Sequence, residues 1–320
     1  MRWPADEDFW IGVNLPWMNY GGDFGANAWR EGGGVGRPGE RLVLRNALAR
    51  VAGEGLTCIR WFMLCDGRAG LRMAADGALE GLDDFVFRDA DAAVEELDRA
   101  GLSALLVLFD FHWFRPAAFV NGVQTCGRAR LAAGSSLRAR LLDRVVDPLL
   151  ERYGRHPSIL AWDVINEPEW VTRGTRLPPR PSEVPRAAMR DFIRGIVDLI
   201  HQRTSHAATV GSASARTLPL VEGLGLDVYQ VHWYDRLGRK APLDRPAASL
   251  GLDRPLILGE FPTRGSRRMP AEIVDTARQN GYAGALAWSA LAGDEASDPD
   301  ALQPVLAASG AGQARRPVRA

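Results

Sequence analysis

The chain has 320 residues and a mass of 34.9 kDa, more than the usual single domain but within the range of one large α/β barrel. Lysine plus arginine equals aspartate plus glutamate at 39 each, so no overall charge favours nucleic acid or an anionic membrane surface. Hydrophobic residues make up 46% and charged residues 24%, which excludes global disorder. The longest apolar runs are shorter than the roughly 18 residues that a membrane helix needs, so no membrane span is expected.

The N-terminus and the cysteines give no sign of secretion or of a bound metal. Residues 1–13, MRWPADEDFWIGV, are acidic where a secretory signal would be apolar, so cytoplasmic residence is expected unless a leader has been removed. Cys58, Cys65 and Cys126 cannot all pair within one chain, and their spacing matches no zinc or haem pattern. We expect neither a metal nor a cofactor.

Short apolar, β-branched or aromatic runs alternate with longer stretches of helical periodicity, as in successive βα units around a parallel sheet. The predicted strands are, in chain order, 9–15, 56–64, 102–111, 158–166, 207–213, 227–234, 255–261 and 282–289. The predicted helices between them are 40–55, 87–101, 136–154, 185–203 and 270–281, with only weak helical segments near 218–224 and 244–251.

Eight strands alternating with helices favour a (β/α)8 TIM barrel over a doubly wound sheet, which typically uses fewer strands. No glycine-rich dinucleotide-binding turn follows the first strand. The prediction is a single catalytic domain over 1–308, with 309–320, which is small, basic and aperiodic, as a flexible C-terminal tail.

In such a barrel the active site lies at the carboxyl ends of the strands. Glu167 and Glu260 fall at the ends of the fourth and seventh predicted strands, so both should point into one mouth. Two carboxylates that flank a bond are what glycoside hydrolysis requires, one to protonate the leaving oxygen and the other to attack or to activate water. Other polar side chains at strand ends are costly to bury alone, and they are expected to face this pair: Arg60, Asp110, His112, Asn166, His232, Tyr234 and Trp288.

These segments resemble clan A of the glycoside hydrolases, and family five in particular. WDVINEPEW carries the Asn-Glu-Pro that follows the fourth strand in this clan, and LILGEFPT resembles the segment of the seventh-strand nucleophile. IRW, DFHW, VHWY and LAWS match the supporting residues of the second, third, sixth and eighth strands. The resemblance covers 11 to about 290 and departs from the family in the long loop after the first strand and in the weak fifth and sixth helices.

The resemblance implies a retaining β-glycoside hydrolase that acts by double displacement on a β-linked glucan, mannan or related oligosaccharide. Glu167 would be the acid/base and Glu260 the nucleophile, with Asn166 binding the sugar 2-hydroxyl. We expect Arg60 and Tyr234 to hold Glu260 ionised, and repulsion from Glu260 to raise the pKa of Glu167.

Aromatic and histidine side chains are the remaining candidates for substrate contact. Trp288 offers an apolar face for a sugar, and His112 and His232 could orient hydroxyls or hold the carboxylates. His156, His201 and His206 are expected on solvent faces. Aromatic side chains also gather near the predicted mouth, and at least half of them should be packing residues: Trp17, Tyr20, Trp29, Trp113, Phe114, Trp170 and Trp233. Among these, Trp17 and Trp113 are predicted to contact substrate.

Two other functions remain open. A metal-dependent barrel hydrolase could draw ligands from Asp110, His112, His232 and Asp235, although no HxH follows the first strand. A non-catalytic glycan-binding barrel would normally have lost one carboxylate, and both are present here. The expected partner is a carbohydrate substrate, not nucleic acid or a membrane. The arginine-rich loop 173–186 could read an anionic glycan or be solvated; the sugar, its linkage, endo or exo cleavage and the oligomeric state are left open.

Overall fold

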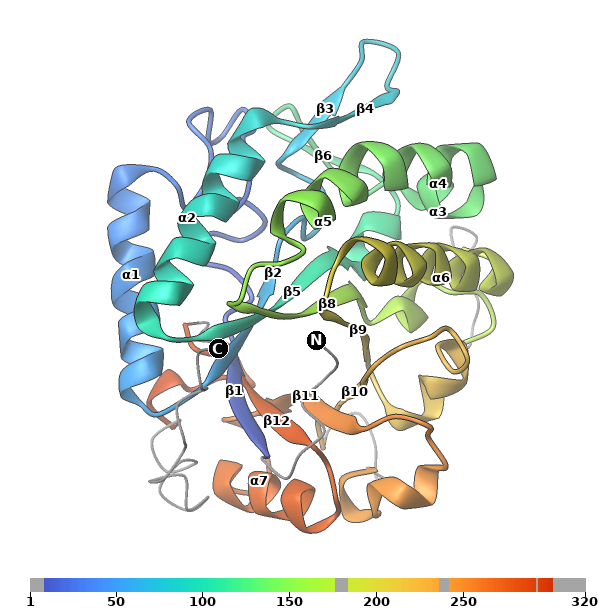
Figure 1. Ribbon diagram of the computed structural model, residues 1–320. Coiled ribbons are helices and arrows are strands. Elements are labelled where there is room, and N and C mark those ends of the chain that lie inside the picture. The colour runs from blue at the N-terminus through green and yellow to red at the C-terminus, as the bar shows by residue number, and fades with distance from the viewer. Residues whose placement is uncertain (1–8, 176–183, 236–241, 292, 302–320) are drawn as a thin grey trace.

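Eight parallel strands close into a barrel surrounded by helices (Figure 1). The computed structural model describes residues 9–175, 184–235, 242–291 and 293–301. Strands follow one another around the barrel in chain order, and β1 closes it by pairing in parallel with both β2 and β12. The barrel strands are β1 (Trp10–Asn14), β2 (Cys58–Phe62), β5 (Ser103–Asp110), β8 (Ile159–Asn166), β9 (Ala207–Ser212), β10 (Tyr229–His232), β11 (Leu256–Pro262) and β12 (Gly284–Trp288).

The predicted (β/α)8 fold is therefore confirmed, with each barrel strand lying within one residue of a predicted range or inside it. The strands read as continuous apolar runs because they are buried on both faces, as parallel strands are. Helices cover the outside of the barrel. None of the described helices is long and apolar enough to cross a membrane. The helices are α1 (Pro38–Gly53), α2 (Asp84–Ala100), α3 (Ala129–Ala133), α4 (Ser135–Leu141), α5 (Asp147–Tyr153), α6 (Arg186–Arg203) and α7 (Pro270–Gln279).

Four details differ from the predicted elements or refine them. Two antiparallel hairpins, β3–β4 (Leu71–Met73, Leu79–Leu82) and β6–β7 (Ala118–Val120, Val123–Thr125), extend loops that follow β2 and β5. The predicted helix 136–154 is broken into α4 and α5 by a π-helical turn, Leu142–Val146. The weak fifth and sixth helices are single 3-10 segments, Ala215–Leu220 and Ala247–Leu250. The predicted tail 309–320 lies outside the described residues.

The barrel interior changes from apolar to polar along the strand direction. Six strands, together with Val228 just before β10, contribute one side chain each to an apolar layer: Cys58, Leu105, Ala161, Ala207, Val228, Ile257 and Leu286. Two residues farther along the strands, where period-two alternation returns side chains to the same face, stand Arg60, Asp163, Thr209 and Gln230. The apolar layer closes the barrel below and leaves a buried polar layer beneath the mouth.

His206 is buried directly before β9, so its predicted place on a solvent face was wrong. Its Nδ1 accepts a hydrogen bond from Nε1 of the buried Trp162 (3.1 Å), and its Nε2 donates to the carbonyl oxygen of His156 (3.0 Å). Burial lowers the pKa of His206 to about 4, from an ordinary value near 6.5. The fold therefore holds this imidazole neutral in a fixed tautomer.

The buried His206 predicts acid sensitivity. Between about pH 6.5 and 4 the unfolded chain protonates this imidazole and the folded chain does not, so its contribution is complete above pH 6.5 and falls by about 3 kcal/mol as the pH falls to 4. The variant His206→Gln should lose less of its unfolding free energy than the wild type over this window, as measured by urea titration at several pH values. At pH 8 the imidazole is neutral in both the folded and the unfolded chain, so the difference in unfolding free energy between the two proteins measures the packing defect alone. If the two unfolding free energies fell in parallel below pH 6.5, the assignment would be contradicted.

Candidate active site

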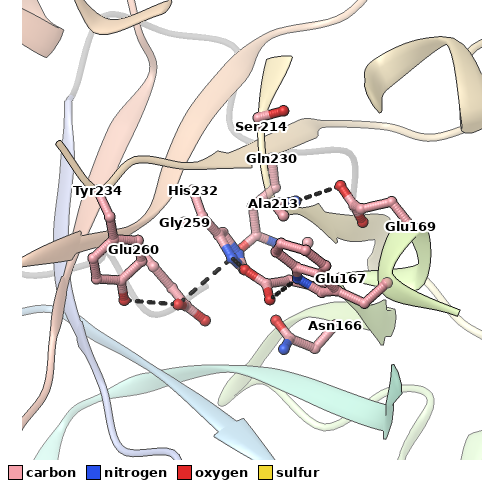
Figure 2. Close-up of polar contacts among 12 residues, drawn as sticks. Asn166, Glu167, Glu169, Ala213, Ser214, Gln230, His232, Tyr234, Gly259 and Glu260 are labelled. Atoms are coloured by element: carbon pink, nitrogen blue, oxygen red, sulfur yellow. Dashed lines mark hydrogen bonds and ion pairs between the residues drawn. The ribbon is translucent and has the colours of Figure 1, made fainter. Parts of the chain in front are cut away.

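The two predicted carboxylates meet in the barrel mouth. Glu260 lies in β11, and Glu167 directly follows β8, three strands away around the ring. One oxygen of each lies within 4.8 Å of the other and of a ring nitrogen of His232. Figure 2 shows the imidazole of His232 between the two glutamates. The fold thus places two carboxyl groups at a separation close to the roughly 5 to 5.5 Å of retaining glycosidases.

Glu260 is held at both oxygens. Nη1 of Arg60 donates to Oε1 (2.8 Å), and the hydroxyl of Tyr234 donates to Oε2 (2.9 Å), as predicted. Nδ1 of His232 lies 3.5 Å from Oε2 (Figure 2). Burial raises the pKa of Glu260, while His232, Arg60 and Tyr234 oppose that rise. The contacts with Arg60 and Tyr234 thus favour the ionised form against the cost of burial.

Arg60 is fully buried and organises the polar layer of the barrel. Its Nε donates to Oδ2 of Asp163 (2.9 Å) and its Nη2 to Oδ1 of Asn166 (2.8 Å), both across the interior from β2 to β8. Its Nη1 also donates to Oδ1 of Asn14 (3.1 Å). Although burial opposes the charge, Asp163 and Glu260 leave the pKa of Arg60 above its usual range. The guanidinium therefore stays charged.

Asp163 completes this layer from below. Besides Arg60, its carboxylate accepts from the amide of Gln230 (2.9 Å) and from the backbone N–H of Gly211 (3.1 Å). A Cβ at Gly211 would lie 2.6 Å from Nη2 of Arg60 and 3.0 Å from Nε2 of His232. Only glycine therefore leaves room at this position of β9 for both side chains.

Glu167 adopts a left-handed backbone conformation, with φ 47° and ψ 53°. For a residue with a side chain this costs about 1–2 kcal/mol, so the surrounding structure must hold it. Its backbone N–H donates to the carbonyl oxygen of Gly211 (2.6 Å), which ties the turn after β8 to β9. In the carboxyl group, Oε2 accepts from Nε1 of Trp170 (2.7 Å) and Oε1 lies 2.8 Å from Nδ1 of His232.

The pKa of Glu167 is raised to about 7, as an acid catalyst needs, but mainly for a different reason from the one predicted. Burial is the largest cause and Asp110 adds to it, whereas Trp170 and Arg60 lower the pKa. The predicted repulsion between the two glutamates is present, but it contributes to the raised pKa of Glu260. Burial also lowers the pKa of His232 to about 4, which leaves a neutral imidazole between the two carboxyl groups.

Asp110 joins Asn166 and His112 at the edge of the site. Oδ2 of Asp110 accepts from the side-chain amide of Asn166 (2.8 Å), and Oδ1 accepts from the backbone N–H of His112 (2.9 Å) and pairs with its Nδ1. Asn166 is thus held between Asp110 and Arg60. Because His112 is half-buried, its ring remains open to the mouth of the barrel.

The aromatic candidates divide between the mouth and the core. Trp288 and Trp17 are half-buried with ring centroids 6.1 Å apart, so both can face substrate. Trp113 is fully buried, and its Nε1 donates to the carbonyl oxygen of Leu64 (2.9 Å), so its predicted contact with substrate was wrong. Phe114 and Trp233 are buried as well, so three of the seven rings are core residues, fewer than the half that was expected.

One loop and one alternative site were also predicted. Within the arginine-rich loop 173–186, residues 176–183 lie outside the described residues. Among the residues that the structure does describe, the potential metal-ligating group is Glu167, His232 and Glu260, and not the set around Asp110 that the metal-hydrolase hypothesis requires. Asp235 instead accepts from Ser266 Oγ (3.1 Å) and from the backbone N–H of Arg267 (2.7 Å). The geometry therefore favours the carboxylate pair.

Four polar residues of the site were not predicted: Asn14, Asp163, Gln230 and Glu169. Glu169 is buried two residues after Glu167; it accepts from the backbone N–H of Ala213 (2.6 Å, Figure 2), and burial raises its pKa to about 7. The signal for Asp163 and Gln230 was a polar residue in the middle of an apolar strand, WDVIN or VYQVH. Such residues need partners inside the barrel.

Comparisons with known proteins agree with this site. The chain is 24% identical to the mannan endo-1,4-beta-mannosidase of Cryptopygus antarcticus, with 91% of this chain and 82% of that protein covered. It is 21% identical to the enzyme of the same name from Mytilus edulis, over 88% of this chain and 83% of the relative. The crystal structure of endo-1,4-beta-mannanase from Eisenia fetida matches with a TM-score of 0.81 at 22% identity, covering 98% of this chain and 93% of that one. No protein-family model matches the chain.

The fold, the carboxylate pair and the curated relatives define a glycoside hydrolase built on a (β/α)8 barrel. The substrate class is therefore carbohydrate. Within that class the chain is similar to the clan A enzymes of family five, and the resemblance predicted from the NEP and GEF segments is confirmed.

The hydrogen bond from Trp170 to Glu167 predicts how the site titrates. Trp170→Phe removes a donor that stabilises the carboxylate, so the pKa of Glu167 should rise above its value of about 7. Carbon-13 NMR titration of glutamate carboxyl groups, assigned with Glu167→Gln, measures the change. Tyr234→Phe is the matched control, because it removes the donor to Glu260 and should raise the pKa of that carboxyl instead. An unchanged Glu167 titration in Trp170→Phe would show that this bond does not tune the group.

Proposed function

We propose that the protein is a retaining endo-acting β-mannanase, with Glu260 as nucleophile and Glu167 as acid/base. The observation that carries the mechanism is the approach of the two carboxyl groups to within 4.8 Å in one mouth, each with its own set of donors. An inverting enzyme needs roughly 6.5 to 9.5 Å, to leave room for water between the carboxylate and the sugar.

The different surroundings of the two glutamates support their roles. Glu260 receives a charged guanidinium donor and a hydroxyl, which stabilise the anion that attacks the anomeric carbon. Glu167, with a pKa of about 7, can carry the proton that the leaving oxygen needs. Once it has lost that proton, it can take one from the water that hydrolyses the glycosyl-enzyme, so the product keeps the β configuration.

The substrate is inferred from the relatives. Both curated relatives named above are mannan endo-1,4-beta-mannosidases, and they align over more than four fifths of their own length. The neutral composition of the chain, and the pairing of Arg60 with Glu260 and of Arg68 with Asp66, suit an uncharged polysaccharide. A β-1,4-linked mannan fits these observations better than an anionic glycan.

A substrate panel with stereochemical analysis tests the proposal. Purified protein should release reducing ends from β-1,4-mannan more rapidly than from β-1,4-glucan or xylan, and the first products should be oligosaccharides rather than single sugars. Proton NMR of the first product should show the β anomer before mutarotation. Inversion would reduce Glu260 to a general base, and a preference for another glycan would refute the assigned substrate.

Azide rescue separates the roles of the two carboxyl groups. Glu260→Ala should lose at least about a thousandfold in kcat, since no covalent intermediate can form; sodium azide should restore turnover of an activated aryl β-mannoside and yield the α-azide. Glu167→Ala should still form the intermediate from this activated substrate, so azide should then yield the β-azide. NMR of the two products gives the assignment directly. The same anomer from both variants would contradict it.

A further inference from the structure

The long loop after β1, residues 15–37, is rigidly held although it lacks helix or extended strand. Buried carboxylates accept its backbone N–H groups. Asp23 binds those of Met18 and Asn19 (2.7 Å each), and Asp89 of α2 binds those of three glycines, Gly25, Gly34 and Gly36, at 2.7–2.9 Å. Side chains carried by this loop are therefore preorganised, which lowers the entropy lost on binding.

This loop extends a row of aromatic side chains outward from the active site. The row begins at Trp288 of β12. In the β1–β12 pairing this residue lies opposite Asn14, which accepts a hydrogen bond from Arg60. Trp17 follows with its ring centroid 6.1 Å from that of Trp288, and Tyr20 lies 4.6 Å from Trp17. The row runs from the end of β12 to the exposed ring of Tyr20.

Arg68 continues the row beyond Tyr20. Its guanidinium carbon lies 4.3 Å from the ring centroid of Tyr20 and 5.5 Å from that of Trp29, so it bridges the two rings. A Cβ at Gly21, where φ is +63°, would lie 2.9 Å from Cδ of Arg68, so the loop is shaped around this side chain. Nη2 of Arg68 pairs with Oδ2 of Asp66 at 2.7 Å, which compensates its charge.

The outer rings are exposed to an unusual degree. Tyr20 is 37% and Trp29 39% exposed, and among the described aromatic side chains only Phe119, at 71%, is more exposed. Rigid rings with a polar edge suit ligands that combine apolar faces with hydroxyl groups. With its cation compensated, the row favours an uncharged ligand.

We propose that Tyr20, Arg68 and Trp29 form a stacking surface, continuous with Trp17 and Trp288, that binds hexose units of a β-linked chain beyond the cleaved bond. This inference rests on the proposed function and adds to it a binding site for the distant part of a long, uncharged substrate. The surface should be filled by oligosaccharides and left empty by short glycosides.

Chain-length dependence in Trp29→Ala tests the proposal. For β-1,4-mannohexaose, kcat/KM should fall about tenfold, the change that about 1.4 kcal/mol of lost binding produces. For an aryl β-mannobioside it should stay within a factor of two. Trp29→Phe keeps a ring and should recover most of the loss. Leu42→Ala, at a 54% exposed position on α1 outside the row, is the control and should change neither substrate.

Binding measurements make the outcome independent of turnover. Isothermal titration calorimetry would measure the binding of β-1,4-mannohexaose and of cellohexaose to Glu167→Gln and to the double variant that also carries Trp29→Ala. The double variant should bind at least one hexasaccharide about tenfold more weakly. Equal affinities for both forms, or equal losses for hexasaccharide and mannobioside, would overturn the stacking surface. If wild-type protein cleaves no mannan while Trp29 still strengthens hexasaccharide binding, the proposed function fails and the binding surface stands.

Discussion

The charge of Arg60, buried at the centre of the barrel, is the constraint on which the site depends. A guanidinium without contact to water is tolerated only when anions surround it with good hydrogen-bond geometry. Asp163, Glu260 and the amide oxygens of Asn14 and Asn166 meet that need from three strands, β1, β8 and β11. Because each partner also binds elsewhere, stabilising one cation fixes the positions of the residues around the anomeric centre.

The neutral groups in the mouth follow from the same balance. Arg60 can offset Asp163 and Glu260 only in part, and Asp110 adds another negative charge nearby. Burial and the charge of Asp110 make ionisation of Glu167 costly, so Glu167 retains a proton near neutral pH. His232 stays uncharged because burial outweighs the attraction of its carboxylate neighbours. Glu167 is thus protonated, Glu260 ionised and the imidazole of His232 between them neutral.

The sequence predicted the barrel because parallel strands buried on both faces stand out as apolar runs, and it predicted Glu167 and Glu260 because they end such runs. It did not reveal the hairpins β3–β4 and β6–β7, because their strands have only three or four residues and β3 and β6 are largely exposed. Asp163 and Gln230 were missed because only strand ends were considered. Trp113 was misplaced because a 3-10 turn, Phe111–Phe114, points it back into the core, and adjacency to a strand end cannot reveal that rotation.

The acceptors that hold the loop after β1 lie partly in another element. Asp83 caps α2 and also binds the backbone N–H of Ala26, while Asp89, one turn and a half further along, binds three more loop amides. Loop and helix therefore form one structural unit, although about fifty residues separate them in the chain. A protein engineer who grafted the loop alone onto another barrel would transfer its aromatic side chains without the scaffold that orders them; the graft must include the first two turns of α2.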